Sequence, residues 1–281
     1  MSSFALTLVL TAAVLHASWN AVVKAASDRS LTIAAIATVN AVAGLTLILF
    51  SDTPAPASWP FIAASAVLHY VYYALMFHAY RLGDLSQVYP ISRGVAPALV
   101  AMGAYLLIGE TLSPLAIAGL LTVSAGIGFL AFQRGAAHAD RRALVAAIML
   151  GLTIAAYSVA DGIGVRWAGD PFGYIGWLSL LESPVVIAVL AMRRRNNIEF
   201  DRRTFMLGLI GGVVSIAAYG IVLYAKTIAP IGAVSAVRES GVIIAALIGV
   251  LMFGERPWQG RIISAIIVAG GVIMLAFSGG H

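Results

Sequence analysis

The chain has 281 residues, of which 61% are hydrophobic and only 10% are charged. A water-soluble chain carries about a quarter charged residues, so this composition, with a mean hydropathy of +0.96, excludes a soluble globular protein. The net charge of +5 does not indicate nucleic-acid binding, because the basic residues lie in short gaps between apolar runs. Cysteine is absent, which excludes disulfides, thiolate metal sites and a cysteine nucleophile.

Ten apolar runs follow one another along the chain, and each is long enough for a membrane crossing, which takes about 20 residues. No basic segment precedes the first run and nine more follow it, so it predicts a first span rather than a cleaved signal peptide. The runs cover residues 4–25, 31–51, 59–80, 86–108, 114–132, 143–165, 171–192, 204–225, 231–253 and 259–278. The sequence therefore predicts an all-α polytopic membrane protein with ten transmembrane helices.

An internal repeat appears when the chain is aligned with itself at one constant offset. The coinciding residues are Arg93 with Arg238, Arg81 with Lys226, Gly109-Glu110 with Gly254-Glu255, and residues 130–132 with 275–277. Each half contains five spans, and an odd number of spans forces the two halves to cross the membrane in opposite directions. We expect two inverted five-helix repeats, residues 1–135 and 141–281, around a central cavity.

The basic residues that flank the spans are distributed unevenly over the two faces of the membrane. Two of them, Arg166 and Lys226, fall on one face. Thirteen fall on the other: Lys24, Arg29, Arg81, Arg134, Arg141, Arg142, Arg193, Arg194, Arg195, Arg202, Arg203, Arg256 and Arg261. The positive-inside rule places these thirteen in the cytoplasm and both termini outside.

The fourth and ninth spans both end in Gly-Glu, as Ile108-Gly109-Glu110 and Phe253-Gly254-Glu255. Together with the ten spans and the repeat, this pattern resembles the drug/metabolite transporter superfamily, EamA type, over the whole chain. The resemblance implies a basket of helices in the bacterial inner membrane, which moves small polar metabolites, often amino acids or their relatives, by alternating access. Eukaryotic members are usually drawn with both termini in the cytosol, the reverse of the orientation that the charges predict.

Charged side chains inside spans are costly and by default mark a binding site or pathway. Arg93 and Arg238 lie at matching depths of the fourth and ninth spans, and an arginine pair can clamp a carboxylate or phosphate through forked hydrogen bonds. Alternatively, each arginine bonds a helix end or an internal carboxylate. Glu239 can be such a partner of Arg238 only if the backbone turns it, because adjacent helix positions do not face each other.

Two further acids lie well inside spans. Asp161, in the sixth span, falls opposite Asn20 when the first and sixth spans are aligned with each other, at a slightly different offset from that of the other pairs. Glu182 precedes Pro184, which predicts a kink in the seventh span. Glu182 is a candidate ligand for a substrate amine or a carrier of a coupling proton; alternatively it is a protonated side chain that bonds neighbouring backbone.

Polar and aromatic side chains form stripes on the first and third spans. An aromatic wall can hold an ammonium group by cation–π attraction, whereas Tyr and Trp in membrane helices also serve as packing or interface anchors. The fourth span contains two prolines, which predict bending. The remaining candidate binding residues are His16, Trp19, Asn20, His69, Tyr73 and Tyr89.

The paired Glu110 and Glu255 lie at helix ends, and we expect them to be structural or interface residues. Glycines in the fifth and tenth spans predict close helix contact, either within the chain or across a homodimer. These glycines are Gly119, Gly126, Gly128, Gly270 and Gly271.

The chain has no His-Glu-x-x-His helix, no Gly-x-Ser-x-Gly elbow and no phosphate-binding glycine loop. We therefore predict that it is not an enzyme or an ATP-driven pump, with no cofactor, metal or nucleic-acid partner. The favoured function is a secondary transporter of a small zwitterionic or anionic, amino-acid-like metabolite, coupled to protons or to exchange, acting as a monomer or homodimer. The alternative is a carrier of cationic amines, quaternary ammonium compounds or lipophilic drugs; an intramembrane enzyme or receptor is the rival from another class.

Overall fold

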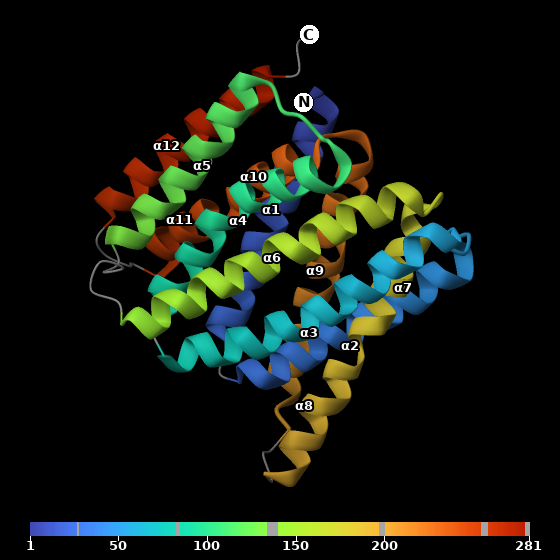
Figure 1. The fold of residues 1–281 in the computed structure, drawn as a ribbon. Coiled ribbons are helices and arrows are strands. Elements are labelled where there is room, and N and C mark those ends of the chain that lie inside the picture. The colour runs from blue at the N-terminus through green and yellow to red at the C-terminus, as the bar shows by residue number, and fades with distance from the viewer. Residues whose placement is uncertain (27, 83–84, 134–139, 197–199, 254–257, 279–281) are drawn as a thin grey trace.

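The computed structural model describes residues 1–26, 28–82, 85–133, 140–196, 200–253 and 258–278, and nearly all of these residues are helical (Figure 1). Ten segments of the described chain are long and apolar enough to cross a membrane, which confirms the all-α fold with ten spans. The helices are α1 (Ser3–Ala25), α2 (Arg29–Phe50), the short 3-10 helix η1 (Pro56–Ser58), α3 (Trp59–Leu82), α4 (Leu85–Ile108), α5 (Pro114–Gln133), α6 (Arg141–Trp167), α7 (Pro171–Glu182), α8 (Pro184–Arg195), α9 (Arg202–Ile228), α10 (Ile231–Glu239), α11 (Gly241–Phe253) and α12 (Gln259–Phe277).

Two of the ten spans are each built from two consecutive helices. The seventh span consists of α7 and α8, which meet at Ser183 directly before Pro184. Proline lacks the backbone N–H that would continue the helix, so the span predicted to kink here is divided into two helices with Ser183 between them. The ninth span consists of α10 and α11, which meet at Ser240 without a proline. The fourth span, by contrast, is one helix, α4, that contains both of its prolines.

Aspartates at helix starts account for several of the scarce acidic residues. Asp28 accepts a hydrogen bond from the Leu31 N–H at the start of α2 (3.0 Å), and Asp170 accepts one from the Phe172 N–H at the start of α7 (2.9 Å). Such a cap satisfies a backbone donor that has no partner within the helix. Asp140 and Asp201 occupy the same position before α6 and α9. The acids inside the spans need another explanation.

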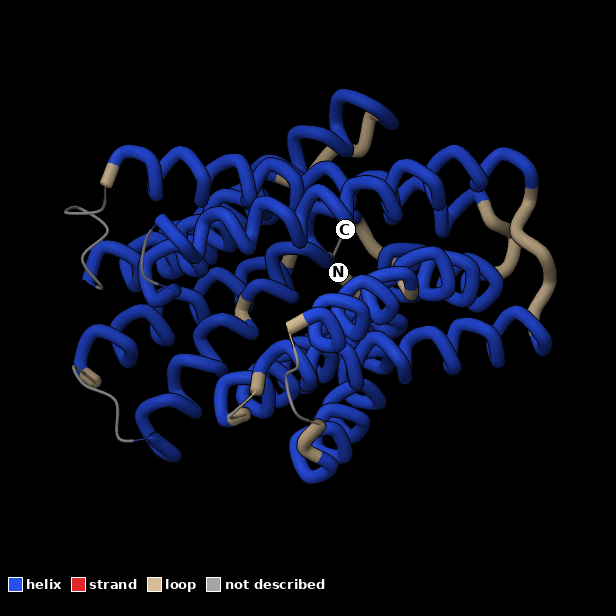
Figure 2. The backbone as a smooth tube through the Cα atoms, turned by 90° about the horizontal axis from the view of Figure 1, so that it is seen from below, coloured by secondary structure: helices blue, strands red, loops and turns tan. Residues whose placement is uncertain are grey.

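The helices pack in a reciprocal arrangement. The first span, α1, packs on α9, and the sixth span, α6, packs on α3 and α4. This is the pairing that an inverted repeat produces, since α3 and α9 are the third spans of the two halves; the repeat itself stays a prediction. The start of α1 and the end of α12 lie at one end of the molecule, opposite the arginine-rich end of α8 (Figure 1). Figure 2 shows only helices and short loops among the described residues.

The predicted contact between the fifth and tenth spans is confirmed within the chain, where α5 packs along α12. A Cβ atom on Gly119 would lie 2.8 Å from the Gly271 carbonyl oxygen, so only glycine allows these backbones to approach. Gly126 faces Val268 at similarly short range. The expectation is wrong for Gly128 and Gly270, where an added Cβ would meet nothing within 4 Å.

Candidate functional site

Two neighbouring charged residues, Arg238 and Glu239, lie directly before the break between α10 and α11. The helix ends at Glu239, and the hydroxyl of Ser240 donates to the Val237 carbonyl oxygen at 2.6 Å. After the break, Gly241 packs on α1 so closely that a Cβ there would lie 2.9 Å from the Ala13 carbonyl oxygen. The side chains of Arg238 and Glu239, adjacent in sequence at the end of α10, are hydrogen-bonded to each other, which meets the condition set by the sequence.

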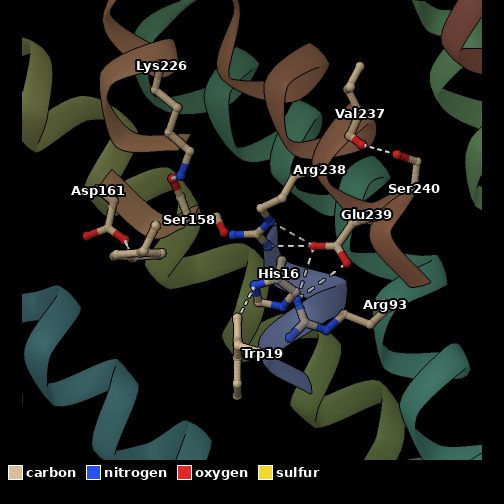
Figure 3. Close-up of polar contacts among 11 residues, drawn as sticks. His16, Trp19, Arg93, Ser158, Asp161, Lys226, Val237, Arg238, Glu239 and Ser240 are labelled. Carbon is tan, nitrogen blue, oxygen red and sulfur yellow. Dashed lines mark hydrogen bonds and ion pairs between the residues drawn. The ribbon is translucent and has the colours of Figure 1, made fainter. Parts of the chain in front are cut away.

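The side chains of Arg93, Arg238 and Glu239 form one cluster, which we call the guanidinium centre (Figure 3). The Arg93 Nη1 atom lies 3.3 and 3.4 Å from the two carboxylate oxygens of Glu239. Arg238 donates from Nε at 3.1 Å and from Nη2 at 2.5 Å to Glu239 Oε1. All three residues are at most 5% exposed. Two guanidinium groups from different spans thus hold a single carboxylate inside the bundle.

His16 of α1 lies beside the guanidinium centre (Figure 3). The Trp19 indole N–H donates to His16 Nδ1 at 3.2 Å, while the buried Nε2 has no hydrogen-bond partner. The hydroxyls of Ser158 and Ser235 are also buried without a partner. Asn20, predicted on the same stripe, instead donates to the His16 backbone carbonyl at 2.7 Å, so its amide supports the helix. Polar atoms without partners are unusual in a protein interior and mark a place where a ligand can bond.

A second polar cluster contains His69, Asp161 and Glu182, and we call it the carboxylate centre. Asp161 is fully buried in α6 and accepts hydrogen bonds from the hydroxyls of Tyr174 and Tyr219. These phenols come from α7 and α9, so one carboxylate joins three spans. No lysine or arginine lies within ion-pair distance of Asp161 in the described part of the chain, and its hydrogen-bond partners are neutral.

Glu182 lies at the break between α7 and α8, with its Oε1 atom 3.2 Å from His69 Nδ1. The distance suits an ion pair if the imidazole is protonated, yet Glu182 Oε1 makes no hydrogen bond, since His69 Nδ1 lies closer to the Ser65 carbonyl oxygen at 2.9 Å. The Tyr70 hydroxyl donates to the Leu181 carbonyl oxygen at 2.6 Å. This phenol satisfies a backbone acceptor that the break leaves without its helical partner.

Aromatic rings connect the two centres. The ring of Tyr157 stacks on His69 with centroids 4.2 Å apart, and it also lies within electrostatic range of Arg93 and Arg238. Tyr73 makes a ring contact with Tyr72, at 5.5 Å between centroids. Tyr89 belongs to α4, but its side chain lies outside the described residues. The wall between the two centres is therefore aromatic, with Tyr157 as its shared member.

Lys226 is a buried cation that the sequence interpretation assigned only to a membrane face. It is 1% exposed, and its Nζ atom donates to the Ser158 carbonyl oxygen at 2.8 Å (Figure 3). Its alignment with Arg81 in the repeat was the available signal. Tyr157 was also missed, although it precedes Asp161 by four residues and so shares its helix face. Tyr174 and Tyr219 come from other spans, and sequence spacing gives no such signal for them.

Glu110 has the structural role expected of it. Its carboxylate pairs with Arg166 at 2.8 Å and accepts the Gly232 N–H at 3.3 Å. Arg166 also donates to the carbonyl oxygens of Lys226 and Ala229 at the end of α9. This cluster ties the ends of four helices together away from the guanidinium centre. Glu255, its counterpart in the repeat, lies outside the described residues.

Among the described residues, no group of three or more His, Asp or Glu side chains is arranged to hold a metal ion. The site therefore consists of two buried polar clusters of opposite character, both located at breaks in membrane-spanning helices. Broken helices at mid-membrane positions commonly supply substrate and ion ligands in transporters.

Comparison with known proteins places this geometry in a family. A solved crystal structure is similar over 99% of this chain and 98% of its own, with a TM-score of 0.75 and 18% identity, which shows a shared fold. The multidrug resistance protein EbrB of Bacillus subtilis (strain 168) is 35% identical over 112 residues, which are 40% of this chain and 92% of EbrB. The EamA-like transporter family model matches residues 3–132 and 141–277. The chain therefore belongs to the EamA-like transporter family and is a multi-pass membrane transporter of small molecules.

Proposed function

We propose that the protein is a secondary active transporter, which moves a small zwitterionic or anionic, amino-acid-like metabolite across the bacterial inner membrane by alternating access. A proton gradient or exchange drives transport, because the sequence has no nucleotide-binding motif. The observation that carries the proposal is the guanidinium centre, where Arg93 and Arg238 hold one carboxylate inside the spans.

Glu239 supports carboxylate recognition because it is itself a carboxylate bound by the two arginines. Arg238 bonds it through two nitrogens, and Arg93 approaches both of its oxygens. A substrate carboxylate that replaced Glu239 would meet N–H donors already aimed at one point. Such preorganisation favours binding, since few side chains have to be ordered when the ligand arrives.

Further ligand contacts are available around the arginines. His16 Nδ1 accepts the Trp19 N–H, so a neutral His16 carries its proton on Nε2, which has no partner. Ser158 of α6 and Ser235 of α10, which precedes Arg238 by three residues, also have buried hydroxyls without partners. An amino acid offers a carboxylate for the arginines and an ammonium for uncharged oxygen acceptors such as a serine hydroxyl, so both of its ends find groups of the right chemistry.

The proposed orientation places both termini outside the cytoplasm, following the thirteen basic residues on the opposite face. The proposed oligomeric state is a monomer or a homodimer. A homodimer through α5 and α12 would use their outer faces, because Gly119 and Gly271 are already in contact within the chain.

A second candidate function is transport of cationic amines or lipophilic cations. Two observations favour it: the similarity to EbrB, which is named a multidrug resistance protein, and the carboxylate centre. There Glu182 Oε1 has no hydrogen-bond partner, and the rings of Tyr157 and Tyr219 lie around His69. Aromatic faces next to a carboxylate suit an organic ammonium ion.

Uptake into proteoliposomes separates the two candidates. The test uses radiolabelled L-alanine as the zwitterion and radiolabelled tetraphenylphosphonium as the lipophilic cation, in vesicles with and without an imposed proton gradient. The first candidate predicts saturable L-alanine uptake that is lost in Arg93→Ala and Arg238→Ala. The matched control is Arg194→Ala, which removes an exposed arginine at the end of α8. Uptake of tetraphenylphosphonium alone, unaffected by either arginine substitution, would replace the first candidate with the second.

A further inference from the structure

Building on the proposed function, we infer that Glu239 is an internal ligand of the guanidinium centre, which the substrate carboxylate displaces once Glu239 takes up a proton. Glu239 is then the residue that couples the substrate to the proton. The same donors, those of Arg93 and Arg238, serve first the protein's own carboxylate and then the carboxylate of the substrate.

The first argument is that Glu239 already occupies N–H donors of both arginines. Glu239 Oε1 accepts from Arg238 Nε, Arg238 Nη2 and Arg93 Nη1, and Oε2 lies 3.4 Å from Arg93 Nη1. A second carboxylate at these three nitrogens would compete for the same N–H groups and would lie beside a like charge. Two ionised carboxylates in one buried site repel each other, and a proton on one of them removes the repulsion.

The second argument is charge balance. Before a ligand binds, the two guanidinium groups face one carboxylate, that of Glu239. When one proton and one substrate carboxylate enter together, Glu239 becomes a neutral carboxylic acid and the substrate supplies the negative charge. The charge that the two arginines face is the same before and after for a monocarboxylate such as acetate, whereas the ammonium of an amino acid adds a charge that other groups have to compensate. This matters inside a membrane, where an additional uncompensated charge is expensive.

The third argument is the position of Glu239 at the helix break. Glu239 is the last residue of α10, and Ser240 separates it from α11. Its side chain can swing away by a local change at this turn, without unwinding a helix. The break also contacts α1 at Ala13, one turn before His16. Release of Glu239 is therefore mechanically connected to the helix that lines the other side of the centre.

The groups around Glu239 come from five helices. They are His16 of α1, Arg93 of α4, Tyr157 of α6, Lys226 of α9 and Arg238 of α10 itself. The sequences of α5 and α11 contain no charged residue, and Arg261 of α12 donates to the Ala246 carbonyl oxygen. Glu239 is thus the one carboxylate of the guanidinium centre, whereas Asp161 and Glu182 belong to the carboxylate centre. A proton that accompanies the anion has a defined acceptor.

The test is isothermal titration of the purified full-length protein in detergent with sodium acetate, the simplest carboxylate, and with L-alanine. Titrations in two buffers of different ionisation enthalpy give the number of protons taken up. We expect the wild type to take up about one proton per ligand bound, with affinity rising as the pH falls. Glu239→Gln removes the internal charge, so it should bind acetate at least about tenfold more tightly at neutral pH, without proton uptake.

The matched control is Glu110→Gln, which removes a carboxylate from the ion pair with Arg166 outside the centre and should behave like the wild type. Wild-type binding without proton uptake, or an unchanged pH dependence in Glu239→Gln, overturns the inference and leaves the proposed function standing. A pH dependence that disappears in Glu182→Gln instead also overturns it. If neither wild type nor Glu239→Gln binds acetate or L-alanine, the proposed function itself fails. The wild-type proton count decides the question even if Glu239→Gln does not fold.

Discussion

The two buried centres stabilise a carboxylate inside the membrane in different ways. In the guanidinium centre, charged groups are balanced by charged groups: Arg93 and Arg238 share Glu239. In the carboxylate centre, Asp161 is held by the neutral hydroxyls of Tyr174 and Tyr219. Two arginines that hold an internal carboxylate present donors suited to the carboxylate of a ligand, whereas a carboxylate held only by neutral phenols presents acceptors suited to an incoming cation. The pairing of each acid therefore indicates the kind of ligand it serves.

This difference also predicts how each centre responds to substitution. Removing one member of a buried ion pair leaves an uncompensated charge, which costs about 3–5 kcal/mol. Removing one partner of a hydrogen-bonded neutral group costs about 1–3 kcal/mol. Substitutions in the guanidinium centre should therefore have the larger effects on both stability and transport.

The largest effect is expected for Arg238→Ala. Arg238 makes shorter contacts with Glu239 than Arg93 does, so the loss of Arg238 leaves the charge of the Glu239 carboxylate less compensated. We expect uptake of L-alanine into proteoliposomes to fall by at least about a hundredfold, because the substrate carboxylate loses two hydrogen bonds to a charged group, each of about 1.5–3 kcal/mol. Arg93→Ala should follow with a smaller loss.

Thermal unfolding in detergent provides the control for this pair of variants. Arg238→Lys restores a positive charge without the fork and should recover stability more than uptake, because a single ammonium cannot reproduce the paired hydrogen bonds. If Arg238→Lys recovers uptake fully, charge alone is sufficient and the geometry of the guanidinium centre is not what binds the ligand.

A smaller loss is expected for Asp161→Asn. The amide keeps one oxygen for a tyrosine hydroxyl, but its NH2 group replaces the second acceptor, so one of the bonds from Tyr174 and Tyr219 is lost. The free energy of unfolding should fall by about 1–3 kcal/mol. A double-mutant cycle with Tyr219→Phe checks the contact: the two effects should not be additive. Additive effects would show that Asp161 and Tyr219 do not interact.

Much of this comparison was accessible from the sequence, but unequally for the two centres. The matched positions of Arg93 and Arg238 in the repeat identified the guanidinium centre, and Pro184 predicted the break beside Glu182. Both rest on local rules: a buried charge marks a site, and proline interrupts a helix.

The break at Ser240 has no such local signal, since no proline precedes it and α1 packs against it. Whether Glu239 pairs with Arg238 could be answered only by the fold, because the sequence did not say which way the backbone turns there. The phenols of Tyr174 and Tyr219 likewise come from separate spans and meet Asp161 only through tertiary packing. Sequence periodicity describes one helix at a time, so it cannot say which faces of distant helices meet.

Glu182→Gln tests whether the two centres bind different classes of ligand. If the carboxylate centre binds cations, loss of the Glu182 charge should lower tetraphenylphosphonium uptake by about tenfold, a little over 1 kcal/mol. L-alanine uptake should change by less than about twofold, a few tenths of a kcal/mol, because Glu182 lies in the other centre. Equal losses for both probes would show that the two centres act as one site.

The smallest effect is expected at an ion pair outside the spans, between Asp28 at the start of α2 and Arg193 at the end of α8. Burial raises the pKa of Asp28, but hydrogen bonds from the Leu31 N–H, Arg193 and Ser30 lower it more, so the pKa lies below its usual value of 3.8. A depressed pKa means that the pair stabilises the fold fully above pH 3.8 and loses this contribution as the pH falls through the lowered value.

Asp28→Asn keeps an oxygen that can cap α2 but removes the charge. Because the Asp28 side chain is still 26% exposed at the edge of the bundle, solvent screens the pair, and we expect the free energy of unfolding to fall by no more than about 1 kcal/mol at neutral pH. Chemical unfolding in detergent should show a constant difference from the wild type above pH 3.8, which shrinks at lower pH. A loss as large as that of Arg238→Ala would contradict the distinction drawn between charges inside the membrane and charges at its edge. The Asp28–Arg193 pair would then have to hold α2 against α8 as firmly as the guanidinium centre holds α4 against α10.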